Sequence, residues 1–283
     1  MTLNQIHQLL SIALDAGIRA SAAIMEVYDT PFGFDDKADG SPITLADHRS
    51  NQIITEALKT TGIPIISEES CITDFTERRH WNEFWLVDPL DGTKEFISRN
   101  GEFAINIALM HNNLPLVGII ISPVSGKAWW GVANEKVFAI DFSALPRKMD
   151  SVSLLKISEP IERKPAGATI GMAVSRSHME PQTLLLLEQI RQKHGDIELV
   201  EKGSALKFCD LVEGRSDLYA RYSPTWEWDT AAGHALLLAH GGEVFHITSH
   251  NPLEYNKQQL LNPGFIAFAR KEDSVGYFAE LSF

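Results

Sequence analysis

The sequence predicts a mixed α/β protein in which helices and strands form layers in two domains. Three observations lead to this prediction. An apolar stripe with a helical period occupies the N-terminus, closely spaced short strands fill the middle of the chain, and strands alternate with helices in the last third. The chain has 283 residues, which is enough for about two domains. We place the boundary in the proline- and charge-rich stretch 143–167, so the predicted domains are 1–150 and 151–283.

Two helices are expected first. A second helix should begin after Thr44, because Thr44 and Asp47 have the spacing of a capping box, in which each side chain bonds to the other residue's backbone. The first helix is predicted by apolar or small side chains at alternating spacings of four and three residues, as one buried helix face requires. These side chains are Ile6, Leu10, Ala13, Gly17, Ala20, Ile24 and Val27.

Short apolar runs bounded by polar turn residues predict strands in the middle of the chain. Because few residues separate most of these runs, neighbouring strands should pair as an antiparallel meander. The runs are 63–66, 85–87, 103–110, 116–122, 128–132 and 137–140.

Strands and helices alternate after the boundary, which is typical of an α/β layered domain. In the last expected helix, the small residues Ala231, Ala232 and Gly233 predict close packing against another element. Strands are expected at 169–174, 197–200, 217–222, 243–246 and 264–269, and helices at 181–193, 204–213 and 229–240.

The composition excludes several classes of protein. Acidic residues outnumber basic ones by 37 to 25, for a formal net charge of −12, so the basic footprint of a protein that binds a nucleic acid polymer is absent. No apolar run is long enough to form an integral membrane segment. Cys71 and Cys209 cannot make a disulfide framework, and we expect no secretory signal and a cytoplasmic protein. Peripheral association with the inner membrane and the oligomeric state stay open.

The sharpest chemical signal is the segment WLVDPLDGT. An apolar strand runs into Asp88, Pro89 should stop its ladder, and Asp91 and Gly92 turn the chain before Thr93. Two carboxylates at the mouth of a sheet repel each other unless a cation lies between them, and carboxylate oxygens suit Mg²⁺. The backbone N–H groups of Gly92 and Thr93 could bind phosphate oxygens.

Further acids follow the same pattern. Glu68 and Glu69 end another apolar strand, and Asp229 opens a predicted helix. An ordinary alternative exists for each, namely a solvated turn for Asp88 and Asp91 and a helix N-cap for Asp229. On the acids alone, both interpretations stay open for Asp88 and Asp91, and the N-cap is preferred for Asp229.

The sequence disfavours an aspartyl-phosphate route. Phosphatases of the haloacid dehalogenase type carry Asp-x-Asp-Gly-Thr, in which the first Asp is the nucleophile. In this chain Asp91, Gly92 and Thr93 supply the second half of that motif. The nucleophile's position is Pro89, which has no carboxylate, and Asp88 stands one residue too early.

Together these segments resemble the inositol monophosphatase-like, lithium-sensitive, Mg²⁺-dependent phosphatases. The DPLDGT core is specific to that superfamily, and its combination with KEFI and LKFC is similar to the bacterial bisphosphate nucleotidases within it. The resemblance spans almost the whole chain. The shared segments are 39–42 with Thr44, Ala46 and Asp47, then 67–69, 85–97, 100–103, 175–178, 206–209, 228–234 and 261–265.

The resemblance implies a layered α/β/α/β/α sandwich of the inositol monophosphatase and fructose-1,6-bisphosphatase type, with Mg²⁺ as cofactor. Glu68, Asp88 and the backbone carbonyl of Leu90 would hold one Mg²⁺. Asp88, Asp91 and Asp229 would hold a second, with Asp88 bridging the two. There is room for a third, weaker ion near Glu68.

The catalytic residues that the resemblance implies are Thr93, Asp47 and Glu68. Thr93 would orient the attacking water with Asp47 behind it, and this role is compatible with Asp47 in a capping box. Two cations about 3.5–4 Å apart can bind the attacking water, the phosphoryl oxygens and the leaving oxygen together, so no phosphoenzyme is needed.

The resemblance places the nucleotide contacts in the second half of the chain. Ser204 and Lys207, three apart on a predicted helix, would share a face. With Arg221 they would hold the phosphate that is not hydrolysed, and His178 would lie near the adenine. The other implied substrate contacts are Glu68, Leu90, Asp91, Gly92, Thr93 and Asp229.

Two departures from the family pattern concern this pocket. The usual motif has two serines after the glycine, whereas this chain has Ser204 followed by Ala205, so one hydroxyl is missing. Trp226 and Glu227 are extra and should reshape the edge of the pocket.

The preferred interpretation is a Mg²⁺-dependent nucleotidase that removes the 3′-phosphate from adenosine 3′,5′-bisphosphate to give AMP, in sulfur assimilation and nucleotide recycling. The sulfated form, 3′-phosphoadenylyl sulfate, stays open as a second substrate. An inositol or sugar phosphatase with the same metal centre is the alternative. Lys207 and Arg221 argue against it, because a monophosphate needs no second anion site. A non-enzymatic nucleotide- or metal-binding module is disfavoured, because the chain retains every type of metal ligand in the family pattern and also has Thr93 and Asp47.

Overall fold

The computed structural model describes residues 1–36, 42–145, 151–165, 167, 169–176 and 179–280. A seven-stranded and a five-stranded sheet form its frame. In these residues no helix is long and apolar enough to cross a membrane. Two ribbons of two strands each complete the sheets, β1 (Phe34–Asp36) with β2 (Pro42–Thr44) and β13 (Thr225–Trp226) with β15 (Leu261–Asn262).

The seven-stranded sheet has the order β3-β4-β5-β6-β7-β8-β9. From β4 onward its strands pair antiparallel, which confirms the predicted meander. In contrast, β3 pairs parallel to β4, because the connection between them, which holds α3 (Phe75–Arg78), carries the chain back to the same end of the sheet. The strands are Ile65–Ser67 (β3), Glu83–Asp91 (β4), Ala104–His111 (β5), Leu114–Ser122 (β6), Lys127–Val132 (β7), Val137–Asp141 (β8) and Glu159–Pro160 (β9).

The five-stranded sheet has the order β11-β10-β12-β16-β14. Strand β10 runs parallel to both of its neighbours, and β16 runs antiparallel to both of its own. The division of the chain at residues 150 and 151 stays a prediction. The strands are Ile170–Ser175 (β10), Ile197–Lys202 (β11), Leu218–Arg221 (β12), Glu243–His246 (β14) and Phe265–Phe268 (β16).

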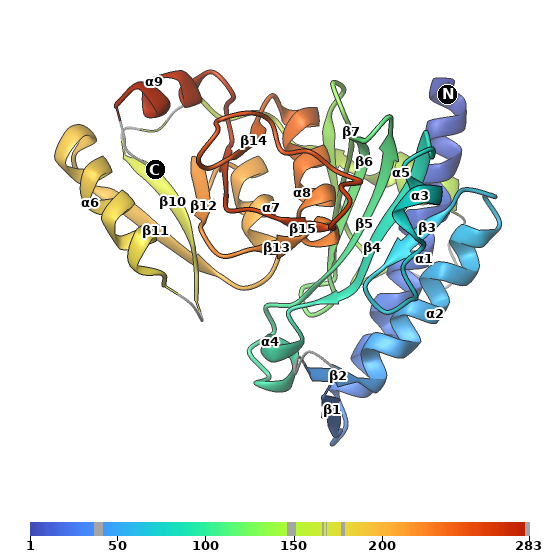
Figure 1. Ribbon diagram of the computed structural model, residues 1–283. Coiled ribbons are helices and arrows are strands. Elements are labelled where there is room, and N and C mark those ends of the chain that lie inside the picture. The colour runs from blue at the N-terminus through green and yellow to red at the C-terminus, as the bar shows by residue number, and fades with distance from the viewer. Residues whose placement is uncertain (37–41, 146–150, 166, 168, 177–178, 281–283) are drawn as a thin grey trace.

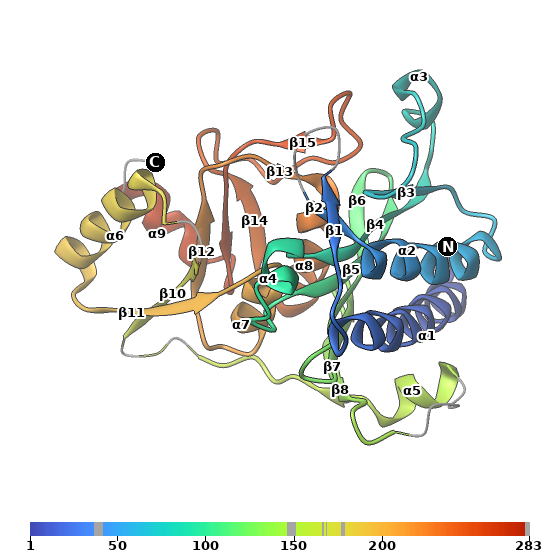
Figure 2. The same cartoon turned by 90° about the horizontal axis from the view of Figure 1, so that it is seen from below.

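Helices form three layers around the two sheets, as Figures 1 and 2 show. Helices α1 and α2 cover the outer face of the seven-stranded sheet, α7 and α8 lie between the sheets, and α6 and α9 cover the outer face of the five-stranded sheet. This is the α/β/α/β/α sandwich. The helices are Leu3–Tyr28 (α1), Leu45–Lys59 (α2), Thr93–Ile97 (α4), Ser151–Ile157 (α5), Pro181–His194 (α6), Leu206–Val212 (α7), Glu227–His240 (α8) and Asp273–Glu280 (α9).

Side chains alternate between the two faces of a strand, which explains why each sheet packs against helices on both faces. In β4, Trp85 and Val87 join the hydrophobic cluster that contains α1 and α2, whereas Phe84 and Leu86 join the cluster that contains α7 and α8. Successive side chains of a strand point to opposite faces, so an almost wholly apolar strand can be buried on both sides. A third cluster packs the outer face of the five-stranded sheet against α6.

The helix predictions are confirmed with small shifts. Helix α2 begins after Thr44, and the capping box of Thr44 and Asp47 is formed. Helix α7 begins at Leu206, two residues after the predicted start, and α8 begins two residues before it, at Glu227. The predicted pattern includes none of the short helices α3, α5 and α9.

Helix α8 packs against β6 and α7 at very short range. A Cβ atom at Gly118 of β6 would stand 2.2 Å from the backbone oxygen of Ala232 and 2.8 Å from the Cβ of Ala235. A Cβ atom at Gly233 would stand 2.2 Å from the Phe208 ring. The small residues at the start of α8 therefore have the close packing that their size predicts.

Replacing Gly118 with alanine should destabilise the fold, because the atom that the new methyl group meets first is backbone and cannot rotate away. We expect the free energy of unfolding in urea to fall by about 2–3 kcal/mol. Gly33→Ala is the matched control, since a Cβ at Gly33 meets nothing within 4 Å. Equal losses in the two variants would contradict the close packing of α8 on the sheet.

Candidate active site

A cavity is lined by residues from both sheets and from the first turn of α8. Among its lining residues are the carboxylates of Glu68, Asp88, Asp91 and Asp229 and the cations of Lys207 and Arg221. The other residues of its wall are Pro42, Leu90, Gly92, Thr93, Lys94, Glu95, Ser175, Glu180, Thr183, Ser204, Tyr219, Ala220, Ser223 and Trp226.

A bulge in β4 brings Asp88 and Asp91 to the same cavity. Asp88 pairs with Asn106 and Asp91 with Ala104, so two residues of β4 oppose a single residue of β5. In a regular strand, residues three apart point to opposite faces, and the extra residue of a bulge returns the second one to the first face. Pro89 cannot donate to the ladder, which places the irregularity here.

The bulge leaves its backbone groups with new partners. The Leu90 N–H donates to Asp88 Oδ1 at 3.0 Å, and Ser50 Oγ donates to the Pro89 carbonyl at 2.7 Å. Asp88 itself is 2% exposed. The ladder of β4 then resumes at Asp91, so the prediction that Pro89 stops it is wrong, and the proline only interrupts the pairing.

The other two carboxylates come from other elements. Glu68 follows β3, and its N–H donates to the Val87 carbonyl at 3.1 Å, which holds it beside the end of β4. Asp229 is the third residue of α8, and its Oδ2 accepts from the Trp226 N–H at 2.9 Å. The N-cap position belongs to Trp226, so the interpretation of Asp229 as an N-cap residue is wrong by three positions.

Burial raises the pKa of three of these carboxylates, Asp88, Asp91 and Asp229. Burial, followed by the charges of Glu68, Asp91 and Asp229, raises the pKa of Asp88 well above its ordinary value. The pKa of Asp229 is also raised well above the ordinary value, by burial and then by Asp91 and Glu68. Burial raises the pKa of Asp91 as well, although Lys207 opposes the shift.

Thr93 lines the cavity and contacts Asp47, which does not. Thr93 begins α4, and its hydroxyl lies 3.2 Å from Asp47 Oδ1 and 3.4 Å from the Leu90 carbonyl. Asp47 is 1% exposed and accepts from the Thr44 N–H at 2.7 Å. One carboxylate therefore caps α2 and also contacts Thr93, as the two roles predicted for Asp47 require.

Two cations face the carboxylates. Lys207 is 2% exposed, and its Nζ donates to the Ser204 carbonyl at 2.7 Å and to the Lys202 carbonyl at 3.2 Å. Arg221 Nε donates to Ser223 Oγ at 3.2 Å. Burial opposes the charge of Arg221, but Tyr219, Asp229 and Asp91 together raise the pKa of its guanidinium.

Ser204 lines the cavity, but it does not lie on a helix as predicted. It lies before α7 with a φ of 53°, in the left-handed region, so it does not share a helix face with Lys207. The Gly203 N–H before it donates to Glu102 Oε2 at 2.9 Å. The next residue, Ala205, donates its backbone N–H to Asp91 Oδ2, a contact that needs no side-chain hydroxyl.

Three residues predicted at the pocket remain, His178, Trp226 and Glu227. His178 lies outside the described residues. Trp226 lines the cavity, but Glu227 does not, so only one of these two extra residues lies at the edge of the pocket. Asn106 was missed, although its Nδ2 lies 3.4 Å from Asp91 Oδ2. A single amide in the otherwise apolar run of β5 is the signal that could have identified it.

The donor set fits a hard cation. In the described part of the chain, no three His, Cys, Asp or Glu side chains are already arranged to hold a metal ion. Even so, Glu68, Asp88, Asp91 and Asp229 line one cavity, and the pKa of Asp88 is raised by the other three. A cation would relieve that repulsion, and an all-oxygen donor set suits Mg²⁺.

The profile of the inositol monophosphatase family matches residues 5–278. The 3′(2′),5′-bisphosphate nucleotidase CysQ of Shigella flexneri is 38% identical over 265 residues, which cover 92% of this chain and 98% of that protein. The protein of the same name from Buchnera aphidicola is 35% identical over 276 residues, which cover 95% of this chain and 97% of that protein.

Solved structures give the same result at the level of the fold. The crystal structure of CysQ from Bacteroides thetaiotaomicron superposes with a TM-score of 0.83 at 38% identity, and the match covers 93% of this chain and 97% of that one. The extragenic suppressor protein suhB of Bartonella henselae superposes with a TM-score of 0.73 at 19% identity, over 95% of this chain and 96% of that one. The second likeness shows the fold alone.

Asp88→Asn should stabilise the metal-free protein, because it removes a buried charge from among three others while Oδ1 can still accept from Leu90. We expect the free energy of unfolding in EDTA at neutral pH to rise by about 1–2 kcal/mol. The pKa of Asp88 is raised in the folded state. Wild-type protein should therefore lose stability as the pH rises from the ordinary aspartate range through that raised pKa, and the variant should lose less.

The control for this comparison is Asp15→Asn. Asp15 is a surface aspartate that pairs with Arg19 across one turn of α1, so its loss should change stability little. If Asp88→Asn instead destabilised the metal-free protein, the carboxylates would not be under mutual repulsion.

Proposed function

The chain belongs to the inositol monophosphatase family, and from that premise we propose that it is a 3′(2′),5′-bisphosphate nucleotidase that hydrolyses adenosine 3′,5′-bisphosphate to AMP. The assignment of the substrate rests on one observation, which is that a metal site and a second anion site lie in one cavity. Four carboxylates suit a metal-assisted hydrolysis, and Lys207 and Arg221 beside them suit a second phosphate.

The metal ligands would be Glu68, Asp88, Asp91, Asp229 and the carbonyl of Leu90, which together would hold two Mg²⁺, with room for a third near Glu68. When bound, the ions supply Lewis acidity that offsets the negative charge on the phosphoryl group and on its nucleophile. The formal charge of the four carboxylates balances that of two divalent ions. The overall acidity of the chain is then no obstacle to an anionic substrate.

Thr93 and Asp47 would orient the attacking water. The Thr93 hydroxyl donates to Asp47 Oδ1, so its oxygen lone pairs stay available to accept a hydrogen from water. Asp47 is fixed by the cap of α2, which limits the rotation of both groups. Orientation of this kind lowers the entropy that must be lost to reach in-line geometry.

The second phosphate would lie against Lys207 and Arg221. Lys207 donates to two carbonyls and Arg221 to a serine, so both cations are fixed in the wall before any ligand arrives. Fixed cations lose little entropy when they bind a phosphate. Trp226 adds an aromatic surface to the same cavity, and it stacks on Trp228 with 5.1 Å between ring centroids. A flat, partly exposed ring suits a nucleobase better than it suits an inositol.

We also propose that the enzyme acts in the cytoplasm, in sulfur assimilation and nucleotide recycling, and that lithium inhibits it. Hydrolysis of the 3′-phosphate fits that setting, since it removes the nucleotide product that sulfate transfer from 3′-phosphoadenylyl sulfate leaves behind. Phosphate release from 3′-phosphoadenylyl sulfate, measured separately, tests whether the sulfated nucleotide is also a substrate.

Phosphate release should be fastest from adenosine 3′,5′-bisphosphate when the enzyme is given a panel that also contains inositol 1-phosphate and fructose 1,6-bisphosphate, each with Mg²⁺. Only the first pairs a nucleobase with a second phosphate on the same nucleoside. Asp91→Asn should abolish release, because it removes one proposed metal ligand. A preference for inositol 1-phosphate would overturn the nucleotidase assignment.

Lys207→Met should raise KM for adenosine 3′,5′-bisphosphate by about tenfold or more, since a charge-assisted hydrogen bond to phosphate contributes about 1.5–3 kcal/mol. KM for adenosine 3′-monophosphate, which lacks the second phosphate, should change much less. Lys94→Met is the control, because Lys94 also lines the cavity but is exposed. Equal losses for both nucleotides would refute the role given to Lys207.

A further inference from the structure

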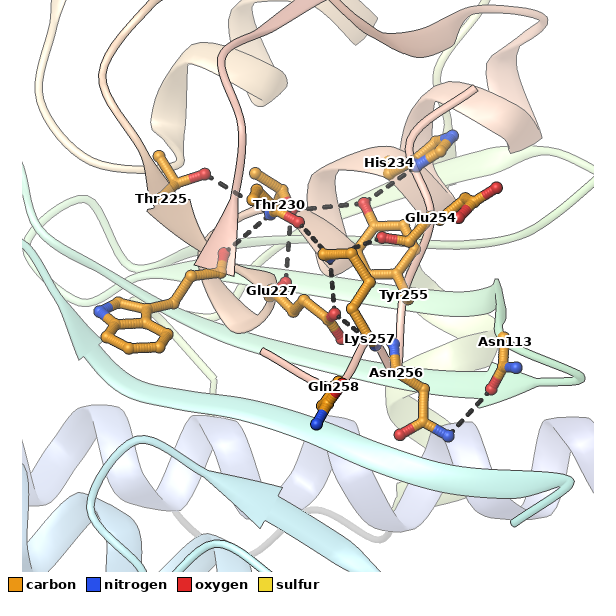
Figure 3. A network of polar contacts seen from close by, with 12 residues as sticks. Asn113, Thr225, Glu227, Thr230, His234, Glu254, Tyr255, Asn256, Lys257 and Gln258 are labelled. Atoms are coloured by element: carbon orange, nitrogen blue, oxygen red, sulfur yellow. Dashed lines mark hydrogen bonds and ion pairs between the residues drawn. The ribbon is translucent and has the colours of Figure 1, made fainter. Parts of the chain in front are cut away.

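A fully buried carboxylate stands at the start of α8, on the side away from the cavity. Glu227 is 0% exposed. Its two oxygens accept from the Asn256 N–H at 2.6 Å, the Lys257 N–H at 3.0 Å and Lys257 Nζ at 2.6 Å (Figure 3). Its own N–H donates to the Leu260 carbonyl at 2.9 Å. These partners all belong to residues 253–262, which we call the anchoring loop.

The anchoring loop holds the first turn of α8 at further points. Asn262 Nδ2 donates to Thr230 Oγ1 at 2.9 Å and to the Trp226 carbonyl at 3.1 Å. Lys257 Nζ donates to Asn262 Oδ1 at 2.8 Å, so the contacts of Glu227 and those of Asn262 form one network. Figure 3 shows Lys257 beside Glu227, at the start of this turn.

The same loop is attached to the seven-stranded sheet by Arg78, which is 2% exposed. Its guanidinium donates to Asn256 Oδ1 at 2.7 Å and to the carbonyls of Lys257 at 2.6 Å and Gln258 at 2.8 Å. Asn256 Nδ2 donates back to the Arg78 carbonyl at 2.9 Å. Arg78 ends α3, in the connection between β3 and β4 that begins with Glu68.

We propose that Glu227 is a positioning residue for the metal centre, which acts by fixing the rotation of α8 so that Asp229 faces the cavity. Residues two apart on a helix point about 200° apart. A first turn whose Glu227 is held by the anchoring loop must therefore present Asp229 on the opposite side. The proposal rests on the metal site proposed above and adds Lys257 and Arg78 as the groups that hold Glu227 and its loop.

Stability alone is a poor explanation for this arrangement. Taking a carboxylate and an ammonium out of water costs free energy that their attraction rarely exceeds, and apolar replacements are often as stable. A buried pair does, however, restrict the chain to one geometry, because removing either partner leaves the other uncompensated. That property suits a helix whose first turn carries a ligand for an ion.

The test is calorimetric titration of full-length, metal-free protein with Mg²⁺ alone, for wild type, Glu227→Gln, Lys257→Met and the double variant. Losing a group that orients a ligand typically weakens metal binding 10–100-fold, so each single variant should bind Mg²⁺ about tenfold more weakly or worse. The double variant should lose less than the sum of the two, because both substitutions break the same pair.

Glu243→Gln is the matched control. Glu243 is also a buried carboxylate that contacts α8, through His234 Nε2 at 2.6 Å, and it also pairs with a lysine, Lys271, at 2.9 Å. It contacts a later turn than the one that carries Asp229. Its loss should lower the thermal unfolding temperature as much as Glu227→Gln does, and should leave Mg²⁺ affinity unchanged.

Wild-type affinity for Mg²⁺ in a Glu227→Gln protein of lowered stability would overturn the proposal, because Glu227 would then be merely structural. If Glu227→Gln does not fold, Lys257→Met decides by the same criterion, since that side chain is 25% exposed and its loss is milder. The titration contains no nucleotide. A different substrate preference would therefore overturn the nucleotidase assignment and leave the measured Mg²⁺ affinities unaffected.

Discussion

The structure depends on holding four carboxylates around one cavity although they repel one another. Glu68, Asp88, Asp91 and Asp229 come from three separate elements, and the pKa of Asp88 is raised by burial and by all three others. Two features make the arrangement possible. The bulge at Pro89 puts two β4 carboxylates on one side, and the layer of α8 between the sheets brings the fourth from a distant part of the chain. A site under such repulsion favours divalent cations over the metal-free state.

The rest of the fold can be understood as support for that site. Close packing of Gly118 and Gly233 brings α8 against β6 and α7, so the helix has little freedom to shift. The anchoring loop sets the rotation of its first turn through Glu227, and Arg78 ties that loop to the connection that begins with Glu68. On the cavity side, the cap of α2 fixes Asp47 and through it Thr93. Asp229 and Thr93 are thus each held by groups that do not line the cavity.

The features of the fold and site that could be predicted from the sequence are those that depend on a local pattern or on a specific motif. The capping box of Thr44 and Asp47, the antiparallel meander and the alternation of strands and helices follow from spacing within a few residues. The network around Glu227 could not be predicted, since Asn256 lies 29 residues from Glu227 and 178 from Arg78 and no local pattern links them. The left-handed backbone of Ser204 was missed because a serine, unlike a glycine, gives no sign of a positive φ. The parallel pairing of β3 depends on where a long connection returns, which composition does not indicate.

The most direct test of the central claim is anomalous diffraction from crystals grown with Mn²⁺, which takes oxygen ligands as Mg²⁺ does. We expect two anomalous peaks inside the cavity, both within coordination distance of Asp88, with Glu68 and the Leu90 carbonyl at one and Asp91 and Asp229 at the other. Peaks confined to surface carboxylates, with no ion among these four side chains, would contradict it.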